Sequence, residues 1–387
     1  MEIYLDHAAT TFVYPEVTDI MCKVMREDFG NPSSMHRKGF EAEKYIKETT
    51  KILSGILKCS EKEIYYTSGG TESNNWALIG AAMANARRGR HIITTEVEHS
   101  AVSAPLSFLE EQGFEITKIG TDKSGRVEPE TLKQALRDDT ILVSVMAVNN
   151  EIGSVMPLEE LGKVIKEKDS AILFHIDAIQ AFGKMELDVR KIKADMLSVS
   201  SHKIHGPKGA GFLYIKDKTK IRPLIYGGGQ QNGYRSGTDN VPGIAGTGIA
   251  AKLMYGNLKA NREHMYAVKK QLADGISGIE NVRFNGPDPS DTIGGAPHVL
   301  NVSFTGIRSE VLLHALEDKG IYVSSGSACS SHKKAISATL SALGCSQKEI
   351  DSSIRFSFCE ATTSEEIEET IRALNELVPM LRRYTRR

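Results

Sequence analysis

Short apolar runs alternate with longer amphipathic stretches over the first two thirds of the chain. Four of these runs have the length and the β-branched or aromatic content of buried strands, at residues 63–67, 91–95, 140–145 and 172–177. A helical pattern from Thr71 to about Ala86 follows the first run. Buried runs separated by helices are typical of βαβ units. The pattern therefore predicts an α/β fold with a mostly parallel sheet that is covered on both faces.

The last third of the chain has a different pattern. A segment rich in Asn, Gly, Pro and Asp at residues 281–291 precedes strand candidates at 298–304 and 321–325. A final helix is predicted from its apolar stripe, which consists of Ile367, Ile371, Leu374, Val378 and Leu381. Thr363, with Glu366 three residues later, fits a capping box at the start of this helix.

The length of 387 residues is sufficient for two domains, and 40% apolar and 25% charged residues are typical of a globular protein with a core. We expect an N-terminal arm, a large α/β domain and a smaller α+β C-terminal domain, at residues 1–15, 16–255 and 256–387. The pattern alone leaves open which of the two domains the arm packs against.

Charge and cysteine content narrow the function classes. The net charge of −1 and the lack of a basic stripe argue against a direct nucleic-acid partner. The N-terminus lacks a secretory signal and no apolar segment approaches membrane-spanning length. The cysteines form no C-x-x-C pair, which argues against a disulfide framework and a metal site; they are Cys22, Cys59, Cys329, Cys345 and Cys359. We expect a cytoplasmic protein with free thiols, no metal and no membrane contact.

An anion-binding turn is predicted between the first strand and its helix. Gly69 and Gly70 allow a close approach of the backbone, and Thr71 adds a hydroxyl donor at the helix start. Glycine turns at this place are common, and most bind nothing. The turn therefore indicates an anion site only in combination with other residues of the chain.

Two further residues accompany the turn. Asp177 ends a predicted strand, where α/β folds place ligand groups, although a lone Asp there is more often a helix cap. Lys203 follows another apolar stretch and lies beside Ser200 and His202. Pyridoxal phosphate (PLP) enzymes need a lysine that forms a Schiff base and an acidic group that keeps the pyridine nitrogen protonated. The pairing of Asp177 with Lys203 fits this chemistry.

With these residues and the following motifs, the chain resembles the cysteine desulfurases of the NifS/IscS type, within the class V aminotransferase-like PLP enzymes. The resemblance runs nearly end to end, over residues 4–11, 30–34, 98–99, 149–153, 235–238 and 325–331. His7 departs from it, because Asn or Tyr is commoner there. The resemblance implies the PLP-dependent transferase fold type I, with PLP in the large domain and the catalytic cysteine in the small one.

The resemblance also implies a role for each site residue. Lys203 would hold PLP and shuttle protons, and His99 would stack on the ring and assist acid–base steps. Asp177 would pair with the ring nitrogen, and Gln180 would bond the ring oxygen. The phosphate would bind Gly70, Thr71, Ser200, His202 and, from the second subunit of a homodimer, Thr238. Asn150 and Arg355 would bind the carboxylate of L-cysteine.

Cys329 is the candidate nucleophile among the cysteines. It lies in the small-residue stretch Ser325-Gly-Ser-Ala-Cys-Ser-Ser331, and the resemblance implies that its thiolate takes the substrate sulfur as a persulfide and leaves alanine. Cys22, Cys59 and Cys345 are expected to be small apolar core residues, and so is Cys359, although it lies close to Arg355.

The resemblance leaves several classes of sulfur acceptor open. The resemblance implies an acceptor protein in iron–sulfur cluster assembly, tRNA thiolation or thio-cofactor synthesis. The stretch after Cys329 lacks Leu-Glu-Pro, and the chain stops at Arg387 without an extended tail, so we expect a specialised acceptor. The alternatives are a selenocysteine lyase, another class V aminotransferase, or a binding subunit without activity.

Overall fold

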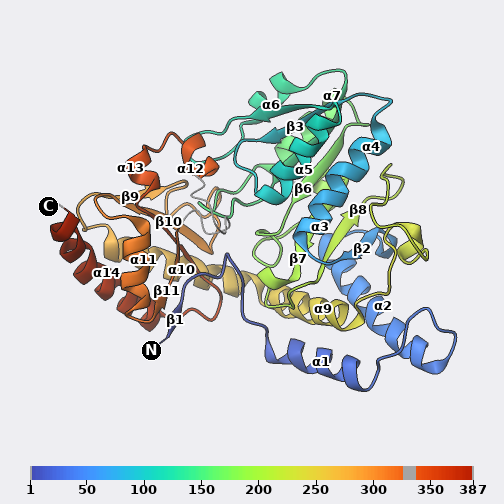
Figure 1. Ribbon diagram of the computed structural model, residues 1–387, viewed down its shortest axis with the longest axis horizontal. Helices are drawn as coiled ribbons and strands as arrows, with labels where there is room; N and C mark the ends of the chain where they lie inside the picture. Colours follow the sequence, from blue (N-terminus) through green and yellow to red (C-terminus); the bar gives the residue numbers. More distant parts are fainter. Residues whose placement is uncertain (1, 326–336, 386–387) are drawn as a thin grey trace.

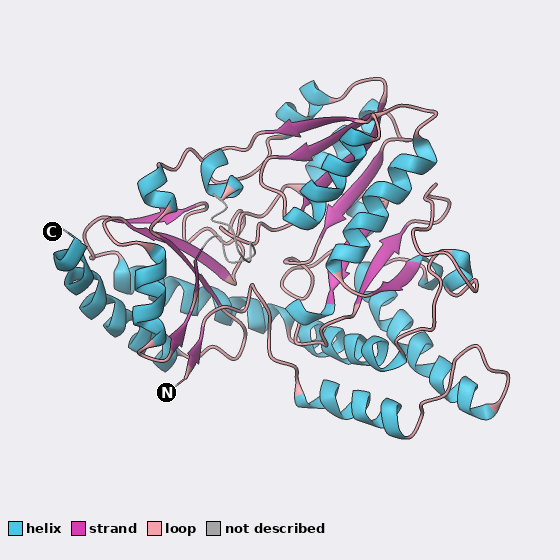
Figure 2. Cartoon of the chain, in the orientation of Figure 1, coloured by secondary structure: helices cyan, strands magenta, loops and turns pink. Residues whose placement is uncertain are grey.

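A computed structural model describes residues 2–325 and 337–385 of the chain. It contains a seven-stranded sheet and a four-stranded sheet, each with its own hydrophobic core. Figures 1 and 2 show the two sheets at opposite ends of the molecule, with the small sheet near both termini.

The large sheet has the strand order β2-β8-β7-β6-β5-β3-β4. Its strands are β2 (Ile64–Thr67), β3 (His91–Thr95), β4 (Glu115–Ile119), β5 (Thr140–Met146), β6 (Leu173–Asp177), β7 (Met196–Ser200) and β8 (Gly211–Ile215). Strand β8 runs antiparallel to the other six strands, which are parallel to one another. The four strands predicted from apolar runs are confirmed as β2, β3, β5 and β6, and so is the mostly parallel sheet.

Both faces of this sheet are buried. Successive residues of one strand belong to different core clusters, as with Ile92 and Ile93 in β3 and Leu142 and Val143 in β5. This is the alternation expected when side chains point to opposite faces of a sheet that is covered on both sides. The prediction of a two-faced sheet is therefore confirmed.

Helices pack on the large sheet and extend from it (Figure 1). They are α1 (Pro15–Arg26), α2 (Arg37–Leu57), η1 (Glu61–Glu63), α3 (Gly70–Asn75), η2 (Trp76–Gly80), α4 (Ala81–Asn85), α5 (Ser100–Glu111), α6 (Pro129–Ala135), α7 (Leu158–Lys168), α8 (Val189–Ile192), η3 (Ser201–Lys203), η4 (Gln231–Gly233) and α9 (Val241–Gly256). The predicted helix at 71–86 is the continuous run of α3, η2 and α4, in which η2 is a π-helical turn. Because α3 starts just after β2, its first turn lies at the edge of the sheet.

The small sheet is antiparallel and has the order β12-β13-β10-β9. Its part of the chain contains α10 (Leu258–Ile276), β9 (Val282–Asn285), β10 (Val299–Phe304), α11 (Ser309–Glu317), β11 (Ile321–Tyr322), β12 (Ser324–Ser325), α12 (Ala338–Ala342), α13 (Gln347–Ile350), β13 (Ser353–Ser357) and α14 (Ser364–Thr385). The capping box of α14 is confirmed: the backbone N–H of Thr363 donates to Glu366 and that of Glu366 to the Thr363 hydroxyl.

The N-terminal arm begins on the small sheet's side. Strand β1 (Ile3–Tyr4) pairs in parallel with β11, and Ile3 and Leu5 are buried in the small sheet's core. The helices α9 and α10 are separated at Asn257, between the two sheets. The domain boundaries expected from the sequence stay predictions. Among the described residues, no helix has both the length and the apolarity needed to cross a bilayer.

Candidate active site

A cavity of about 240 Å³ lies where strands β6 and β7 end. Every residue predicted to bind cofactor or substrate lines it except Thr238: Gly70, Thr71, His99, Asn150, Asp177, Gln180, Ser200, His202, Lys203 and Arg355. The remaining walls include Ala8, Ala9, Ala101, Met146, Val148 and Ile179. The carboxyl ends of parallel strands thus bring together residues that are far apart in the sequence.

One end of this site is suited to an anion. A second cavity of about 360 Å³ shares Gly70, Thr71, Ser200 and His202 with the first. The helix that starts at Gly70 has first-turn N–H groups without carbonyl partners of the helix. A side chain at Gly70 would collide with Ile179, since a Cβ there would lie 2.1 Å from Ile179 Cδ1. A larger residue at position 70 would therefore displace the Ile179 side chain, which lines the site.

The carboxylate of Asp177 lies buried at the end of β6. Its Oδ1 accepts the N–H of Ile179 at 3.0 Å and its Oδ2 the side-chain amide of Asn74 at 2.7 Å. Burial raises the pKa of Asp177, and the two hydrogen bonds oppose that effect. A cation placed against this carboxylate would offset the cost of its burial, as a protonated ring nitrogen does.

A second carboxyl group, that of Glu98, lies beside this site. It accepts the Thr95 hydroxyl at 2.7 Å and the Met146 N–H at 2.9 Å. Burial raises the pKa of Glu98 to about 8, with the Asp177 carboxylate as a further cause. Glu98 is therefore mostly protonated at pH 7 and adds little negative charge near Asp177.

Lys203 follows β7 in the short helix η3. Its ammonium donates hydrogen bonds to the carbonyls of Ala8 and Ala9, the latter at 2.7 Å. The arm that carries Ala8 and Ala9 thus closes one side of the cavity. Gln180 also donates to the Ala8 carbonyl, at 2.9 Å, and its oxygen lies 3.2 Å from Nε2 of His298.

His99 is the N-cap of α5. Its Nδ1 accepts the N–H of Ala101 at 3.1 Å, so the neutral ring carries its proton on Nε2. Burial lowers the pKa of His99; Asp177 opposes this effect and Lys203 adds to it. Burial also lowers the pKa of His202 to about 4, so this ring is neutral at pH 7 and can donate only one N–H.

Arg355, in the middle of β13, supplies the guanidinium of the site. Its Nη2 pairs with Asp6 Oδ1 at 2.8 Å and its Nη1 donates to the Asn150 carbonyl at 2.9 Å. Its Nε is buried and has no hydrogen-bond partner among the described residues. Asp6 and Asn150 therefore fix the guanidinium at the wall of the cavity, where its positive charge favours an anionic group such as a carboxylate.

Replacing Arg355 by lysine is expected to raise KM for L-cysteine about 10- to 100-fold, with a smaller change in kcat, because one ammonium cannot reproduce the hydrogen bonds of the guanidinium fork. Steady-state alanine formation measures both constants. Arg372→Lys, at an exposed i,i+3 ion pair with Glu369, is the matched control. An unchanged KM in Arg355→Lys would exclude Arg355 from substrate binding.

A cluster of charged side chains supports the backbone of Lys203. The buried ammonium of Lys184 donates to the Lys203 carbonyl at 2.6 Å. Glu360 accepts the Tyr14 hydroxyl, and His205 Nε2 lies 3.3 Å from its other oxygen. Burial lowers the pKa of Lys184 to about 8, and Glu360 opposes this effect. His205, Cys359 and Glu360 have metal-ligand atoms within 4.8 Å of one another, and Glu360 also interacts electrostatically with Lys184.

This cluster predicts a pH-dependent contribution to stability. Burial would raise the pKa of Glu360, but His205 and Tyr14 outweigh burial and lower it to about 2. This value is below the unfolded value of about 4.3, so the stabilisation is present above that pH and is lost as pH falls toward 2. Glu360→Gln should therefore lower the free energy of unfolding at pH 7 by about 2 kcal/mol.

Thermal or denaturant unfolding of Glu360→Gln and the parent chain between pH 7 and about pH 2.5 measures this effect. The difference between the two proteins should shrink below about pH 4.5. Glu365→Gln, on an exposed position of α14, is the control and should track the parent at every pH. A difference that stayed constant over this range would contradict the assignment of the stabilisation to the ionised Glu360.

One predicted residue among those described, Thr238, is exposed and does not line the cavity. Cys329 lies outside the described residues. Burial raises the pKa of Cys59 and Cys359 to about 12 and also raises that of Cys345, so these thiols are poor nucleophiles at neutral pH.

Several residues of the site were not predicted. Asp6 pairs with Arg355, and Asn74 donates to Asp177. Glu98 accepts the N–H of Met146, which lines the cavity. Asn74 had a usable signal, because it lies one helical turn after Gly70 and so on the same helix face. Asp6 and Glu98 lie within motifs that resemble a known family, but nothing local in the sequence points to their partners.

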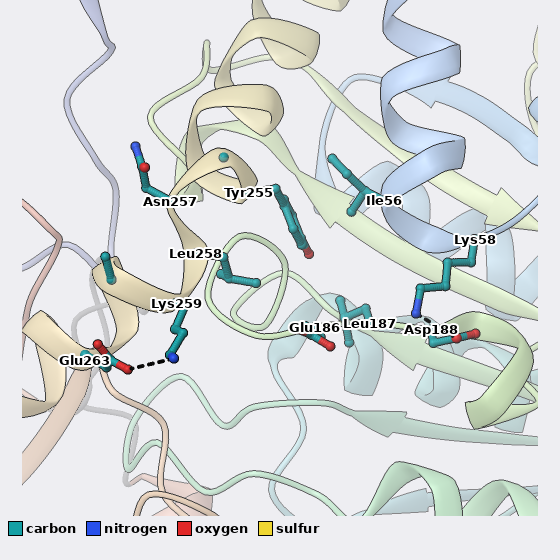
Figure 3. A pocket seen from close by; sticks show the side chains of 12 residues that line it. Ile56, Lys58, Glu186, Leu187, Asp188, Tyr255, Asn257, Leu258, Lys259 and Glu263 are labelled. Carbon is teal, nitrogen blue, oxygen red and sulfur yellow. Dashed lines mark ion pairs between the residues drawn. The ribbon is translucent and has the colours of Figure 1, made fainter.

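A larger cavity, of about 710 Å³, contains none of these residues (Figure 3). It lies around the start of α10 and the end of α2. Lys58 pairs with Asp188 at 3.2 Å and Lys259 with Glu263 at 3.9 Å on its walls. The two lysines on its walls are thus paired with acidic side chains. The smaller cavity gathers the predicted cofactor and substrate groups and is therefore the candidate active site.

The class V aminotransferase family model matches residues 3–370 of the chain. The chain is 43% identical over 380 residues to a cysteine desulfurase IscS from Methanosarcina thermophila, covering 98% of this chain and 93% of that one. The match therefore includes both sheets and the site between them.

Solved structures give the same result. A NifS-like protein superposes with a TM-score of 0.92 at 36% identity, covering 98% of this chain and all of the other. A structure of SspA in complex with cysteine superposes with a TM-score of 0.79 at 33% identity, covering 94% of this chain and all of the other. The fold predicted from the sequence is thereby confirmed.

Proposed function

The chain belongs to the class V aminotransferase family and to its cysteine desulfurases of the IscS and NifS type, and on this premise we propose that its cavity at β6 and β7 binds PLP and L-cysteine. The observation that carries the proposal is the convergence of Lys203, Asp177, His99 and Arg355 on one cavity. The reaction converts L-cysteine to L-alanine and transfers the sulfur to Cys329.

The residues of the cavity fit PLP. Asp177 offers a buried carboxylate for a ring nitrogen, Lys203 an amine for the aldehyde, and His99 an imidazole beside both. The cavity end formed by Gly70, Thr71, Ser200 and His202 offers N–H and hydroxyl donors for a phosphate. When bound, PLP withdraws electrons from the substrate carbon next to the amine and so weakens the bonds at that carbon.

The remaining groups bind the substrate and move protons. Arg355, held by Asp6 and the Asn150 carbonyl, binds the carboxylate of L-cysteine. The amine of Lys203 exchanges a proton with the carbon next to the substrate amine. The neutral His99 ring, with its proton on Nε2, assists the acid–base steps. Its lowered pKa keeps the ring neutral at pH 7.

Cys329 accepts the sulfur in this proposal. Its thiolate attacks the sulfur of the substrate, an S–S bond forms, the carbon–sulfur bond breaks, and protonation of the carbon leaves alanine. Cys59, Cys345 and Cys359 are weaker candidates, because burial raises the pKa of each thiol. The persulfide on Cys329 then passes its sulfur to an acceptor protein.

We further propose a homodimer that shares its active sites. Large apolar side chains are exposed on the single chain, among them Phe29 at 69%, Met35 at 95% and Tyr226 at 74%. Exposed apolar side chains of this size are often covered by a protein partner. Thr238 is exposed as well, which is compatible with a contact to the phosphate of a second subunit.

The compartment follows from the thiol chemistry. A persulfide and a thiolate nucleophile require a reducing compartment, and we propose the cytoplasm. The acceptor is proposed to be a specialised protein of tRNA thiolation or thio-cofactor synthesis. Sulfur transfer to an iron–sulfur scaffold as fast as to any other acceptor would contradict this assignment.

The activity is tested with purified protein, PLP, L-cysteine and a reductant. Alanine and sulfide should form in equal amounts. Yellow protein that forms a keto acid from amino acids, but no sulfide, would assign the chain to a class V aminotransferase. Activity with L-selenocysteine and none with L-cysteine would assign it to a selenocysteine lyase, and absence of both activities would leave a binding role.

A further inference from the structure

The turn that follows β5 carries a carboxylate with no role in the reaction described above. Glu151 comes directly after Asn150, which lines the cavity. Its carboxylate accepts the hydroxyl of Ser337 at 2.5 Å, and its carbonyl accepts the side-chain amide of Asn301 at 3.1 Å. Burial raises the pKa of Glu151, and the Ser337 hydroxyl and Arg355 oppose this effect. The carboxylate thus joins the substrate-binding turn to a distant part of the chain.

Ser337 is the N-cap of α12, where its hydroxyl oxygen accepts the N–H of Leu340 at 3.0 Å. Two more contacts join α12 to the same turn. The side-chain amide of Asn149 donates to the Thr339 hydroxyl at 3.3 Å, and Ile152 packs with Leu340 in a small buried cluster. The start of α12 is therefore docked on the residues that flank Asn150.

The chain on the other side of residues 326–336 is also fixed near the substrate site. Ser324 pairs with Arg355, and Ser325 with Ile354, where β12 meets β13. Cys329 lies between Ser325 and Ser337 in the sequence. Both described anchors of the Cys329 segment therefore adjoin a residue proposed to bind the substrate carboxylate, Arg355 on one side and Asn150 on the other.

We propose that Glu151 is a positioning residue for sulfur transfer: by its hydrogen bond to Ser337 it fixes the C-terminal anchor of the Cys329 segment to the turn that binds the substrate carboxylate. The inference rests on the proposed desulfurase function. Glu151 and Ser337 would thereby act on the attacking thiol through the chain that joins Ser337 to Cys329. Small errors in such positioning slow a reaction strongly.

Two substitutions of Ser337 separate this role from helix capping. Asp and Thr both serve as N-caps, so both retain an oxygen that accepts the Leu340 N–H. Ser337→Thr keeps the hydroxyl that donates to Glu151, whereas Ser337→Asp places a second carboxylate against it. Glu151→Ala removes the acceptor instead. Ser341→Ala, on the same helix with its hydroxyl donating to the Ser337 carbonyl, is the control.

The first readout is the rate at which persulfide forms on Cys329 in a single turnover with L-cysteine, followed by alkylation and mass spectrometry. Ser337→Asp and Glu151→Ala should each slow it about tenfold, the effect of one lost hydrogen bond to a charged group. Ser337→Thr and Ser341→Ala should stay within about twofold of the parent chain. The double variant Glu151→Ala/Ser337→Asp should lose less than the product of the two single effects.

The second readout is independent of the loaded enzyme's activity. Amide hydrogen exchange of residues 337–343 without substrate should be faster in Ser337→Asp and Glu151→Ala and unchanged in Ser337→Thr. PLP content should be the same in all variants. A purely structural role would instead lower PLP content and slow every step alike.

Equal persulfide rates in Ser337→Asp and Ser337→Thr would overturn the positioning role while the proposed function stands. A parent chain that forms neither alanine nor persulfide would overturn the proposed function, and the positioning role with it. The two failures are distinguishable because the first leaves an active parent enzyme.

Discussion

Replacing Lys203 by alanine is expected to lower kcat for alanine formation from L-cysteine by about 10⁴-fold or more, because both the covalent attachment of PLP and the proton transfer are lost. The chain should stay folded. The carbonyl of Ala8, which accepts a hydrogen bond from Lys203, keeps its bond from Gln180. The loss should therefore appear in the chemistry rather than in stability.

Borohydride treatment of the PLP-loaded chain, followed by peptide mass spectrometry, measures the attachment directly. A pyridoxyl group should be found on Lys203 in the parent and be missing in Lys203→Ala. Lys123→Ala, at an exposed turn position, is the control and should keep full activity. If Lys203→Ala retained a tenth of the parent's activity, Lys203 could not be the cofactor lysine.

Replacing Asp177 by asparagine is expected to lower kcat about 10²- to 10³-fold, because removing one member of a buried charge pair costs about 3–5 kcal/mol. The carboxylate is buried and receives two hydrogen bonds, and a neutral amide there could not stabilise a protonated ring nitrogen. Asn74→Ala removes one of those two hydrogen bonds and should cost about tenfold.

Steady-state alanine formation and the absorbance of bound PLP measure this effect. The Asp177→Asn spectrum should show PLP still bound, with its pH dependence shifted. Asp19→Asn, on an exposed position of α1, should match the parent. Full activity in Asp177→Asn would show that the PLP ring withdraws electrons without help from the Asp177 carboxylate.

Local patterns in the sequence were sufficient for much of the fold. Buried apolar runs located β2, β3, β5 and β6, because strands that are covered on both faces need few polar residues. The same runs located Asp177, which ends one of them. The glycine turn before α3 was recognisable from Gly69 and Gly70 between a strand-like run and a helical run. Its close approach to Ile179 is visible only in the structure.

Long-range electrostatics were not accessible from the sequence. Asp6 and Arg355 form an ion pair although 349 positions separate them, and no local pattern records such a contact. The cluster of Lys184, His205 and Glu360 likewise joins three distant segments. These side chains hold Arg355 and the backbone of Lys203, so the sequence predicts the reacting groups better than it predicts their supports.

Sulfur transfer to Cys329 is tested most directly by a single turnover with excess enzyme and L-cysteine labelled with heavy sulfur, followed by peptide mass spectrometry. One labelled sulfur on Cys329 is expected for each alanine formed. In Cys329→Ala, neither labelled persulfide nor sulfide should appear while PLP binding is retained. Labelled sulfide released at the parent rate by Cys329→Ala, or label on another cysteine, would contradict sulfur transfer to Cys329.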